Sequence, residues 1–258
     1  FTEHLNRYNT ISVNMQEFLS RSKSIYELID RFKRLVIREL KYEYPDVDYF
    51  DDTDLIECMQ DIYAQKKQTF IIIIDEWDCI FREYKEDKNA QEKYLDFLRD
   101  LLKDKSYIHL AYMTGILPIK KYGTHSALNM FDEFSMIDPG PLARYVGFTE
   151  DEVSDLCKKY QMDMAEIKSW YDGYQFGSVE VYCPWDVLNY CDKLKDHSDS
   201  FPENYWINTS GNDAVKKFIQ MSGNFKTKRE IETLLAGEEI IKEATMSSLE
   251  LESGLSNA

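Results

Sequence analysis

The chain has 258 residues, of which 43% are hydrophobic, and a formal net charge of −16. This length allows one large domain or two modest ones, and the apolar fraction is sufficient for a real core. A surface this acidic repels DNA, RNA and anionic lipid, so we expect no non-specific nucleic-acid binding by this chain.

The five cysteines form no C-x-x-C pair, which argues against a zinc knuckle or a redox pair and favours reduced thiols in a cytoplasmic protein. The longest apolar run, Phe70–Ile74, is far too short to cross a bilayer, so we expect no membrane association. We recognise no signal peptide. The chain begins at Phe1 rather than Met and ends in a Ser-rich segment, which indicates ends that are cut from something longer or left unfolded.

The first part of the chain predicts a strand followed by two helices. Alternation of apolar and polar residues from Ile11 to Met15 is typical of a strand. Ser24 and Glu27 form a capping box at the start of an amphipathic helix that extends to Leu40. A second helix is expected over residues 55–63.

A continuous β-branched run, Thr69–Asp75, comes next and predicts a strand buried on both faces, as in a parallel sheet. A helix is expected over residues 94–102, and a further strand over Tyr107–Met113. This alternation of strands and helices is typical of an α/β domain, which we assign to residues 1–141.

After Pro141 the pattern becomes mainly helical. Capping residues or proline predict helix starts near Thr149, Asp163 and Pro184, and residues 174–182 predict a small hairpin around Gly177-Ser178. We therefore expect a mainly helical second domain over residues 142–245 and a disordered tail over residues 246–258.

The sharpest chemical signal is the sequence Phe70-Ile-Ile-Ile-Ile-Asp75-Glu76, because an apolar strand that ends in Asp-Glu is the Walker-B pattern of P-loop ATPases. Such a strand ends at the carboxyl edge of the sheet, where α/β proteins bind ligands. Asp75 is then expected to face Mg²⁺ through water, and Glu76 to polarise the attacking water. Acidic residues also follow strands simply to cap the next helix, and this alternative stays open.

The next predicted strand ends in Met113-Thr114-Gly115. In many P-loop ATPases a polar residue at this place senses the terminal phosphate, so Thr114 is a candidate for that role. A threonine with only a packing or turn role is the alternative.

Several longer stretches resemble the bacterial predicted AAA-ATPase-like family over about residues 1 to 240. They read TFIIIIDEWDCIFREY, YLDFLRDLLKD, AYMTGILPIKKYGTHSALNMFDEFSM and YVGFTEDEV, followed by WYDGY. The resemblance implies an additional-strand P-loop fold, in which a parallel sheet is flanked by helices and followed by a helical lid. It also implies ATP and Mg²⁺ as cofactors, Asp75 and Glu76 as the Walker-B pair, and Thr114 as the sensor-like position.

The resemblance further implies a post-sensor segment that includes Lys120, Lys121, Ser126 and Asn129, to which we assign no role. In this fold the strand that leads into the Walker-A loop lies between the sensor strand and a last strand, for which residues 134–137 are the candidate. No G-x-x-x-x-G-K-[ST] loop occurs in these 258 residues, so a gap beside the sensor strand, closure by residues 134–137, or pairing with another chain is expected.

Three functional hypotheses follow. The first is the Walker-B half of an ATPase whose intact form binds and hydrolyses ATP. The 258 residues alone are expected to be inactive, because they lack the Gly-rich loop that neutralises the charge of the phosphates. The second is a non-catalytic interaction or scaffold module with a P-loop-like fold. The third is a regulatory part of a nuclease-linked defence or mobile-element protein.

Overall fold

The computed structural model describes residues 3–119, 128–136, 138–176, 178–197 and 199–205, together with residues 229, 233 and 236. The chain divides into two compact units, Phe1–Glu133 and Phe134–Ala258. The tail expected over residues 246–258 lies outside the described residues.

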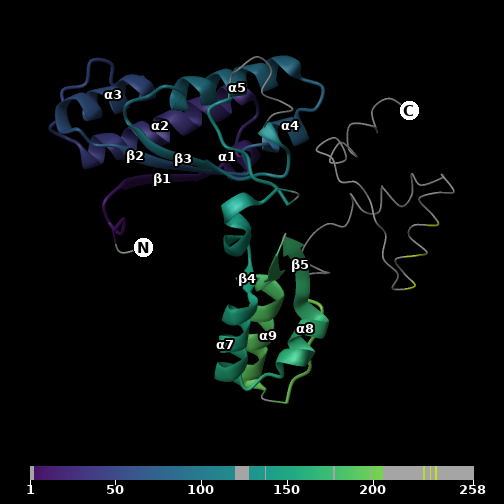
Figure 1. Ribbon diagram of the computed structural model, residues 1–258. Coiled ribbons are helices and arrows are strands. Elements are labelled where there is room, and N and C mark those ends of the chain that lie inside the picture. The colour runs from purple at the N-terminus through teal and green to yellow at the C-terminus, as the bar shows by residue number, and fades with distance from the viewer. Residues whose placement is uncertain are drawn as a thin grey trace. The chain divides into compact units, whose positions relative to one another are not determined.

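The first unit alternates helices with strands (Figure 1). Its described elements are, in chain order, β1 (Asn9–Asn14), α1 (Met15–Ser20), α2 (Ile25–Glu43), α3 (Leu55–Lys66), β2 (Phe70–Asp75), α4 (Cys79–Glu83), α5 (Lys88–Leu102) and β3 (Ile108–Met113). The three strands are parallel and lie in the order β1-β2-β3. The predicted α/β class with a parallel sheet is therefore confirmed for this unit.

Polar residues set the starts of the helices that pack on this sheet. Asn14 ends β1 and caps α1 by accepting a hydrogen bond from the backbone N–H of Glu17. Ser24 caps α2 in the same way through the N–H of Glu27, and Asp54 caps α3. Each cap satisfies backbone N–H groups that have no partner inside the helix, so the chain turns from strand or loop into helix at a defined residue.

The helices cover one face of the sheet. Phe70, Ile72 and Ile74 of β2 are buried against them, and Figure 1 shows α2, α3 and α5 on this side. On the other face Ile71 and Ile73 are only partly buried. Their register partners on β3, Leu110 and Tyr112, are 52% and 45% exposed.

The prediction that the strand over Thr69–Asp75 is buried on both faces is therefore wrong for this structure. A continuous apolar run reports which side chains can be buried, whereas burial itself requires an element packed on each face. Among the described residues of this unit the helices supply that cover on one face.

The strand expected at residues 134–137 is also not present as predicted. Residues 134–136 form no strand, and Ile137 lies outside the described residues. The segment turns instead, because the N–H of Ser135 donates to the Asp138 carbonyl at 3.0 Å and the N–H of Asp138 donates to Ser135 Oγ at 3.1 Å. Within the described part of the chain, β3 thus has β2 as its one strand neighbour.

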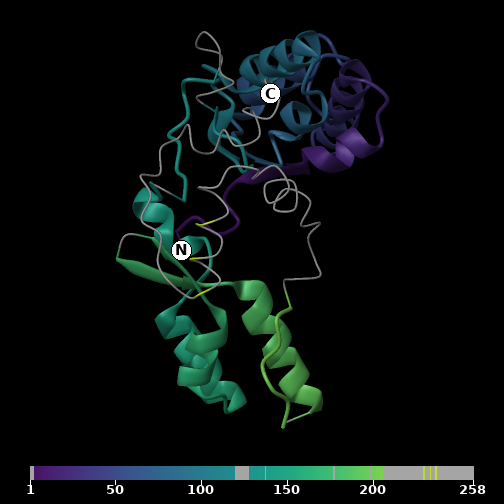
Figure 2. The ribbon, with the colours of Figure 1, turned by 90° about the vertical axis from the view of Figure 1, so that its right-hand side faces the viewer.

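The second unit combines helices with a small antiparallel sheet (Figure 1 and Figure 2). Its described elements are the 3-10 helix η2 (Gly140–Tyr145), β4 (Phe148–Thr149), α7 (Glu150–Tyr160), α8 (Met164–Tyr171), β5 (Asp172–Phe176), β6 (Val179–Tyr182) and α9 (Pro184–Asp196). The strand order is β4-β6-β5, and β5 pairs with β6 around the position where the sequence predicts a hairpin. Thr149 and Glu152 form the predicted capping box at the start of α7.

All five cysteines have free thiols, so the structure contains no disulfide. Among the helices of the described residues, none has the length and apolar character that crossing a membrane requires.

Candidate functional site

Three polar side chains meet at the carboxyl ends of the parallel strands. Asn14 is the last residue of β1 and pairs in register with Asp75, the last residue of β2. Thr114 directly follows β3, and its backbone N–H donates to the carbonyl of Ile74 at 2.9 Å, which extends the ladder by one residue. Because parallel strands end at the same edge of a sheet, these three residues, distant in sequence, become neighbours.

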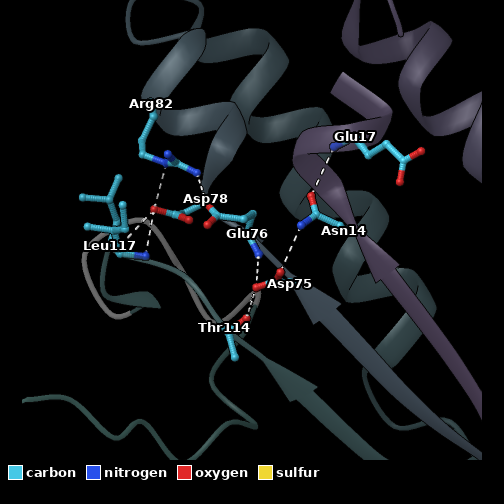
Figure 3. A network of polar contacts seen from close by, with 9 residues as sticks. Asn14, Glu17, Asp75, Glu76, Asp78, Arg82, Thr114 and Leu117 are labelled. Atoms are coloured by element: carbon cyan, nitrogen blue, oxygen red, sulfur yellow. Dashed lines mark hydrogen bonds and ion pairs between the residues drawn. The ribbon is translucent and has the colours of Figure 1, made fainter. Parts of the chain in front are cut away.

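Asp75 is the centre of this group (Figure 3). Its Oδ1 accepts hydrogen bonds from Thr114 Oγ1 at 2.5 Å and from the backbone N–H of Glu76 at 3.0 Å. Its Oδ2 accepts from Asn14 Nδ2 at 3.0 Å. The carboxylate is therefore held by three donors while the residue stays exposed to solvent.

Glu76 leaves the strand in a different direction. Its φ of 56° is in the left-handed region, which costs a residue with a Cβ roughly 1–2 kcal/mol. The backbone is fixed on both sides of it, because the N–H of Trp77 donates to the Thr114 carbonyl at 3.0 Å and the N–H of Cys79 donates to the Glu76 carbonyl at 3.1 Å. The Glu76 carboxylate forms an ion pair and hydrogen bond with the guanidinium of Arg82 on α4.

Asp78 lies beneath this ion pair and is fully buried. Its Oδ2 accepts hydrogen bonds from the backbone N–H groups of Ile116 at 3.2 Å and Leu117 at 3.0 Å. The same oxygen lies 3.3 Å from Nε of Arg82, so one guanidinium is shared between Asp78 and Glu76. Its other oxygen, Oδ1, has no hydrogen-bond partner among the described residues.

Gly115 permits the close approach of the segment after β3 to these side chains. A Cβ at this position would lie 2.6 Å from Asp78 Oδ1 and 2.6 Å from Cδ1 of Trp77. Trp77 is itself 2% exposed, so neither neighbour has open space to move into. Residues 115–117 therefore pack closely against Asp78.

A surface pocket of about 600 Å³ opens beside Glu76. It is lined by Asn14, Gln16, Glu17, Ser20, Glu76, Arg82 and Glu83. Neither Asp75 nor Thr114 is among these residues. Three carboxylates face one guanidinium here, so the pocket by itself disfavours an anionic ligand such as a phosphate group.

Burial also sets the pKa of the Cys79 thiol, which lies next to the site. Desolvation raises the pKa of Cys79 to about 12, and the nearby guanidinium of Arg82 only partly opposes this. The thiolate is the reactive form of cysteine, so Cys79 is a packing residue rather than a nucleophile.

The structure brings together two of the three predicted site residues, Asp75 and Thr114, through a direct hydrogen bond. The third, Glu76, is adjacent in sequence but directs its carboxylate to Arg82. Of the post-sensor residues, Asn129 accepts a hydrogen bond from Lys103 at 3.1 Å. Lys120, Lys121 and Ser126 lie outside the described residues.

Sequence reasoning missed three residues of this site: Asn14, Asp78 and Arg82. Signals for them were present. Asn14 is a capping residue type near the end of a predicted strand, and Asp78 and Arg82 stand four residues apart, the spacing of ion pairs on a helix.

Among the described residues there is no group of three or more histidine, cysteine or acidic side chains that could enclose a metal ion. A metal at this edge would therefore depend on Asp75, water and the ligand's own oxygens. Mg²⁺ is commonly bound in this way, by one or two carboxylates with retained water and substrate phosphates.

Comparisons with known proteins agree with the resemblance read from the sequence. The family described as "Predicted AAA-ATPase" matches residues 2–124, a shorter stretch than the resemblance covers. A curated protein from Azotobacter chroococcum mcd 1, described as "Uncharacterized protein in vnfD 5'region", is 25% identical over 138 residues, which are 51% of this chain and 26% of that protein. The chain thus spans about a quarter of this relative's length. No solved structure matches the chain.

Proposed function

We propose that the first unit is the Walker-B half of a P-loop ATPase, in which Asp75 serves Mg²⁺–ATP and Glu76 serves the attacking water. This proposal proceeds from the match of residues 2–124 to the predicted AAA-ATPase family. The single structural observation that carries it is the hydrogen bond between Asp75 and Thr114 at the ends of neighbouring parallel strands. The activity of the whole protein is part of the proposal, because the chain spans only about a quarter of the curated relative.

The bonding of Asp75 fits a magnesium ion held through water. A carboxylate offers roughly four lone-pair positions. Thr114, Asn14 and the N–H of Glu76 use three of them and fix the orientation of the group. Because Asp75 is exposed, the remaining position can accept a hydrogen bond from a metal-bound water. When bound, Mg²⁺ supplies charge neutralisation for the phosphates.

Glu76 is the candidate for orienting water, because it directly follows Asp75 in the chain and its side chain is partly exposed, at 35%. Thr114 is the candidate for sensing the terminal phosphate. Its hydroxyl donates to Asp75, so a phosphate oxygen that accepts from this hydroxyl would compete with Asp75 for the same proton.

The Glu76–Arg82 pocket is a poor place for the phosphates themselves, because carboxylates outnumber cations there. We therefore place the phosphates on the Asp75–Thr114 side. A phosphate-binding loop supplied by other residues of the protein is required for this arrangement.

A non-catalytic interaction module is the second candidate. It is favoured by one observation: Leu110 and Tyr112 expose large side chains, 52% and 45% respectively, on the face of the sheet opposite α2, α3 and α5 (Figure 1). Apolar surface of this kind can serve as a contact for another chain.

Nucleotide binding and hydrolysis by the full-length protein separate the two candidates. Glu76→Gln keeps the size of the side chain and removes its charge, so we expect ATP binding to remain while hydrolysis falls by about 100-fold or more. Asp75→Asn is expected to weaken binding only when Mg²⁺ is present. Isothermal titration with and without Mg²⁺ and steady-state phosphate release measure both effects.

Glu39→Gln is the matched control, because Glu39 is exposed on α2 and the same charge is removed away from the site. It should leave binding and turnover unchanged. Full turnover in Glu76→Gln would contradict the catalytic role of Glu76, and absence of Mg²⁺–ATP binding by the full-length protein would leave the interaction module as the better candidate.

A further inference from the structure

Two acidic side chains of the site, Glu76 and Asp78, share one cation. The guanidinium of Arg82 contacts the Glu76 carboxylate through Nη2 and the Asp78 carboxylate through Nε. Arginine suits this position because its planar fork presents several donors in fixed directions, whereas a lysine ammonium is a single point charge. The orientation of the Glu76 side chain is therefore tied to that of Asp78.

Asp78 is in turn fixed by the segment that follows the predicted sensor residue. Two backbone N–H groups, those of Ile116 and Leu117, donate to its Oδ2, and no part of its side chain is exposed. Buried charged groups are costly unless they are paired, so separation of Asp78 from these donors is unfavourable. Gly115 allows this contact, because a Cβ at this position would lie 2.6 Å from Asp78 Oδ1.

These contacts form a continuous path between two residues of the site. The path runs from Thr114 through the backbone of residues 115–117 to Asp78, then through Arg82 to Glu76 (Figure 3). Beyond the covalent backbone of residues 114–117, each step is a hydrogen bond or an ion pair between groups that are buried or partly buried. A second, shorter link exists in the backbone, where the N–H of Trp77 donates to the Thr114 carbonyl.

We propose that Arg82 is a positioning residue that couples the carboxylate of Glu76 to the backbone of residues 115–117 through the buried carboxylate of Asp78. A displacement of Thr114 or of the segment after it is thereby transmitted to Glu76. The catalytic meaning of this coupling rests on the proposed function, in which Glu76 orients water and Thr114 senses phosphate. The coupling itself is a property of the first unit and does not require a nucleotide.

Hydrogen exchange of the full-length protein tests the coupling without ATP. The exchange rates of the Ile116 and Leu117 amides are compared among wild type, Glu76→Gln, Arg82→Gln and the double variant. Glu76→Gln releases Arg82 from one of its two carboxylates, so in the wild-type background these rates should change by at least about twofold, the lower end of couplings within one network. In the Arg82→Gln background the same substitution should leave them unchanged.

Equal changes in both backgrounds, or no change in either, would overturn the coupling. Arg82→Lys is the second variant in case Arg82→Gln does not fold, because a lysine keeps a positive charge beside Asp78 but lacks the two separate nitrogens through which Arg82 contacts Asp78 and Glu76. It should weaken the effect of Glu76→Gln on these exchange rates. Arg34→Gln is the matched control, since Arg34 forms an exposed ion pair with Asp30 at 2.8 Å on α2.

Kinetics separate this proposal from the proposed function. If Glu76 orients water, Arg82→Gln should lower kcat by about 10-fold to 100-fold, as misplacement of a reacting group does, and leave the Kd for ATP within about twofold of wild type. Unchanged kcat in a protein that hydrolyses ATP would overturn the positioning role of Arg82. If the full-length protein does not hydrolyse ATP at all, the proposed function fails, and the exchange measurement still decides whether the coupling exists.

Discussion

One ion-pair group of the first unit is buried, and one of the second unit is exposed. In the first unit the Asp78 carboxylate is fully buried and shares the Arg82 guanidinium with Glu76. In the second unit Lys168 forms ion pairs with Glu150 and Glu180, and all three side chains are at least 37% exposed. Buried charges cost stability when one partner is lost, whereas exposed pairs are screened by solvent. Loss of a charged side chain is therefore expected to cost more stability at the strand ends of the first unit than at the exposed pairs of the second.

The largest effect that follows from this comparison is expected for Asp78→Ala. The change removes the acceptor of two backbone N–H groups and the buried partner of Arg82, so the free energy of unfolding of the first unit should fall by about 3–5 kcal/mol. Denaturant-dependent hydrogen exchange of the β2 amides measures this loss in the full-length protein.

Asp163→Ala is the corresponding change in the second unit. Asp163 caps α8 by accepting from the N–H of Ala165 at 2.9 Å, so its loss should cost about 1 kcal/mol, read from exchange of the β6 amides. Equal losses of unfolding free energy for the two aspartates would mean that the buried charge of Asp78 contributes no more to stability than an exposed helix cap.

A smaller effect is expected from filling the space beside Asp78. In Gly115→Ala the new Cβ would meet Asp78 Oδ1 and Trp77 Cδ1 at 2.6 Å, so the first unit should lose about 1–3 kcal/mol through overpacking. Gly173→Ala in β5 is the matched change, because its nearest contact is the Val181 carbonyl oxygen at 3.4 Å, an ordinary distance.

The same exchange measurement compares the two glycine variants, with the β2 amides reporting on one unit and the β6 amides on the other. Gly173→Ala should change stability by less than about 1 kcal/mol. A Gly115→Ala protein as stable as the wild type would show that the segment after β3 can move away from Asp78, which would also weaken the proposed path to Glu76.

The smallest effect is expected at the exposed ion pairs. The hydrogen bond to Glu180 is the main reason that the pKa of Lys168 is raised, so any stability that it contributes is present below the ordinary lysine pKa and is lost only as pH rises through the higher folded value. Between about pH 6 and pH 9 the charge of Lys168 is therefore constant. Because these pairs are exposed, the thermal unfolding midpoint of the second unit in Lys168→Gln should equal that of the wild type at each pH in this range. Circular dichroism of the thermal transition measures it. A clear fall in the midpoint would mean that Lys168, like Asp78, contributes substantially to stability.

Much of the secondary structure of both units could be predicted from local patterns. Period-2 alternation located β1, the continuous run located β2, and capping residues located the starts of α2 and α7. These signals lie within a few residues of one another, so they survive without knowledge of the fold. The strand expected from the resemblance at residues 134–137 is not formed by residues 134–136, because Ser135 and Asp138 hydrogen-bond to each other and turn the chain.

The sequence by itself determined the α/β alternation and the placement of Asp75, Glu76 and Thr114 after two apolar strands. Tertiary structure decided what these side chains contact. The order and register of the parallel strands placed Asn14 and Thr114, 61 and 39 residues away, on Asp75. The left-handed backbone of Glu76 and the buried carboxylate of Asp78 bring the Glu76 side chain into contact with Arg82. Such contacts depend on which strands are neighbours and on what fills the space between them, and no local pattern of residues encodes either.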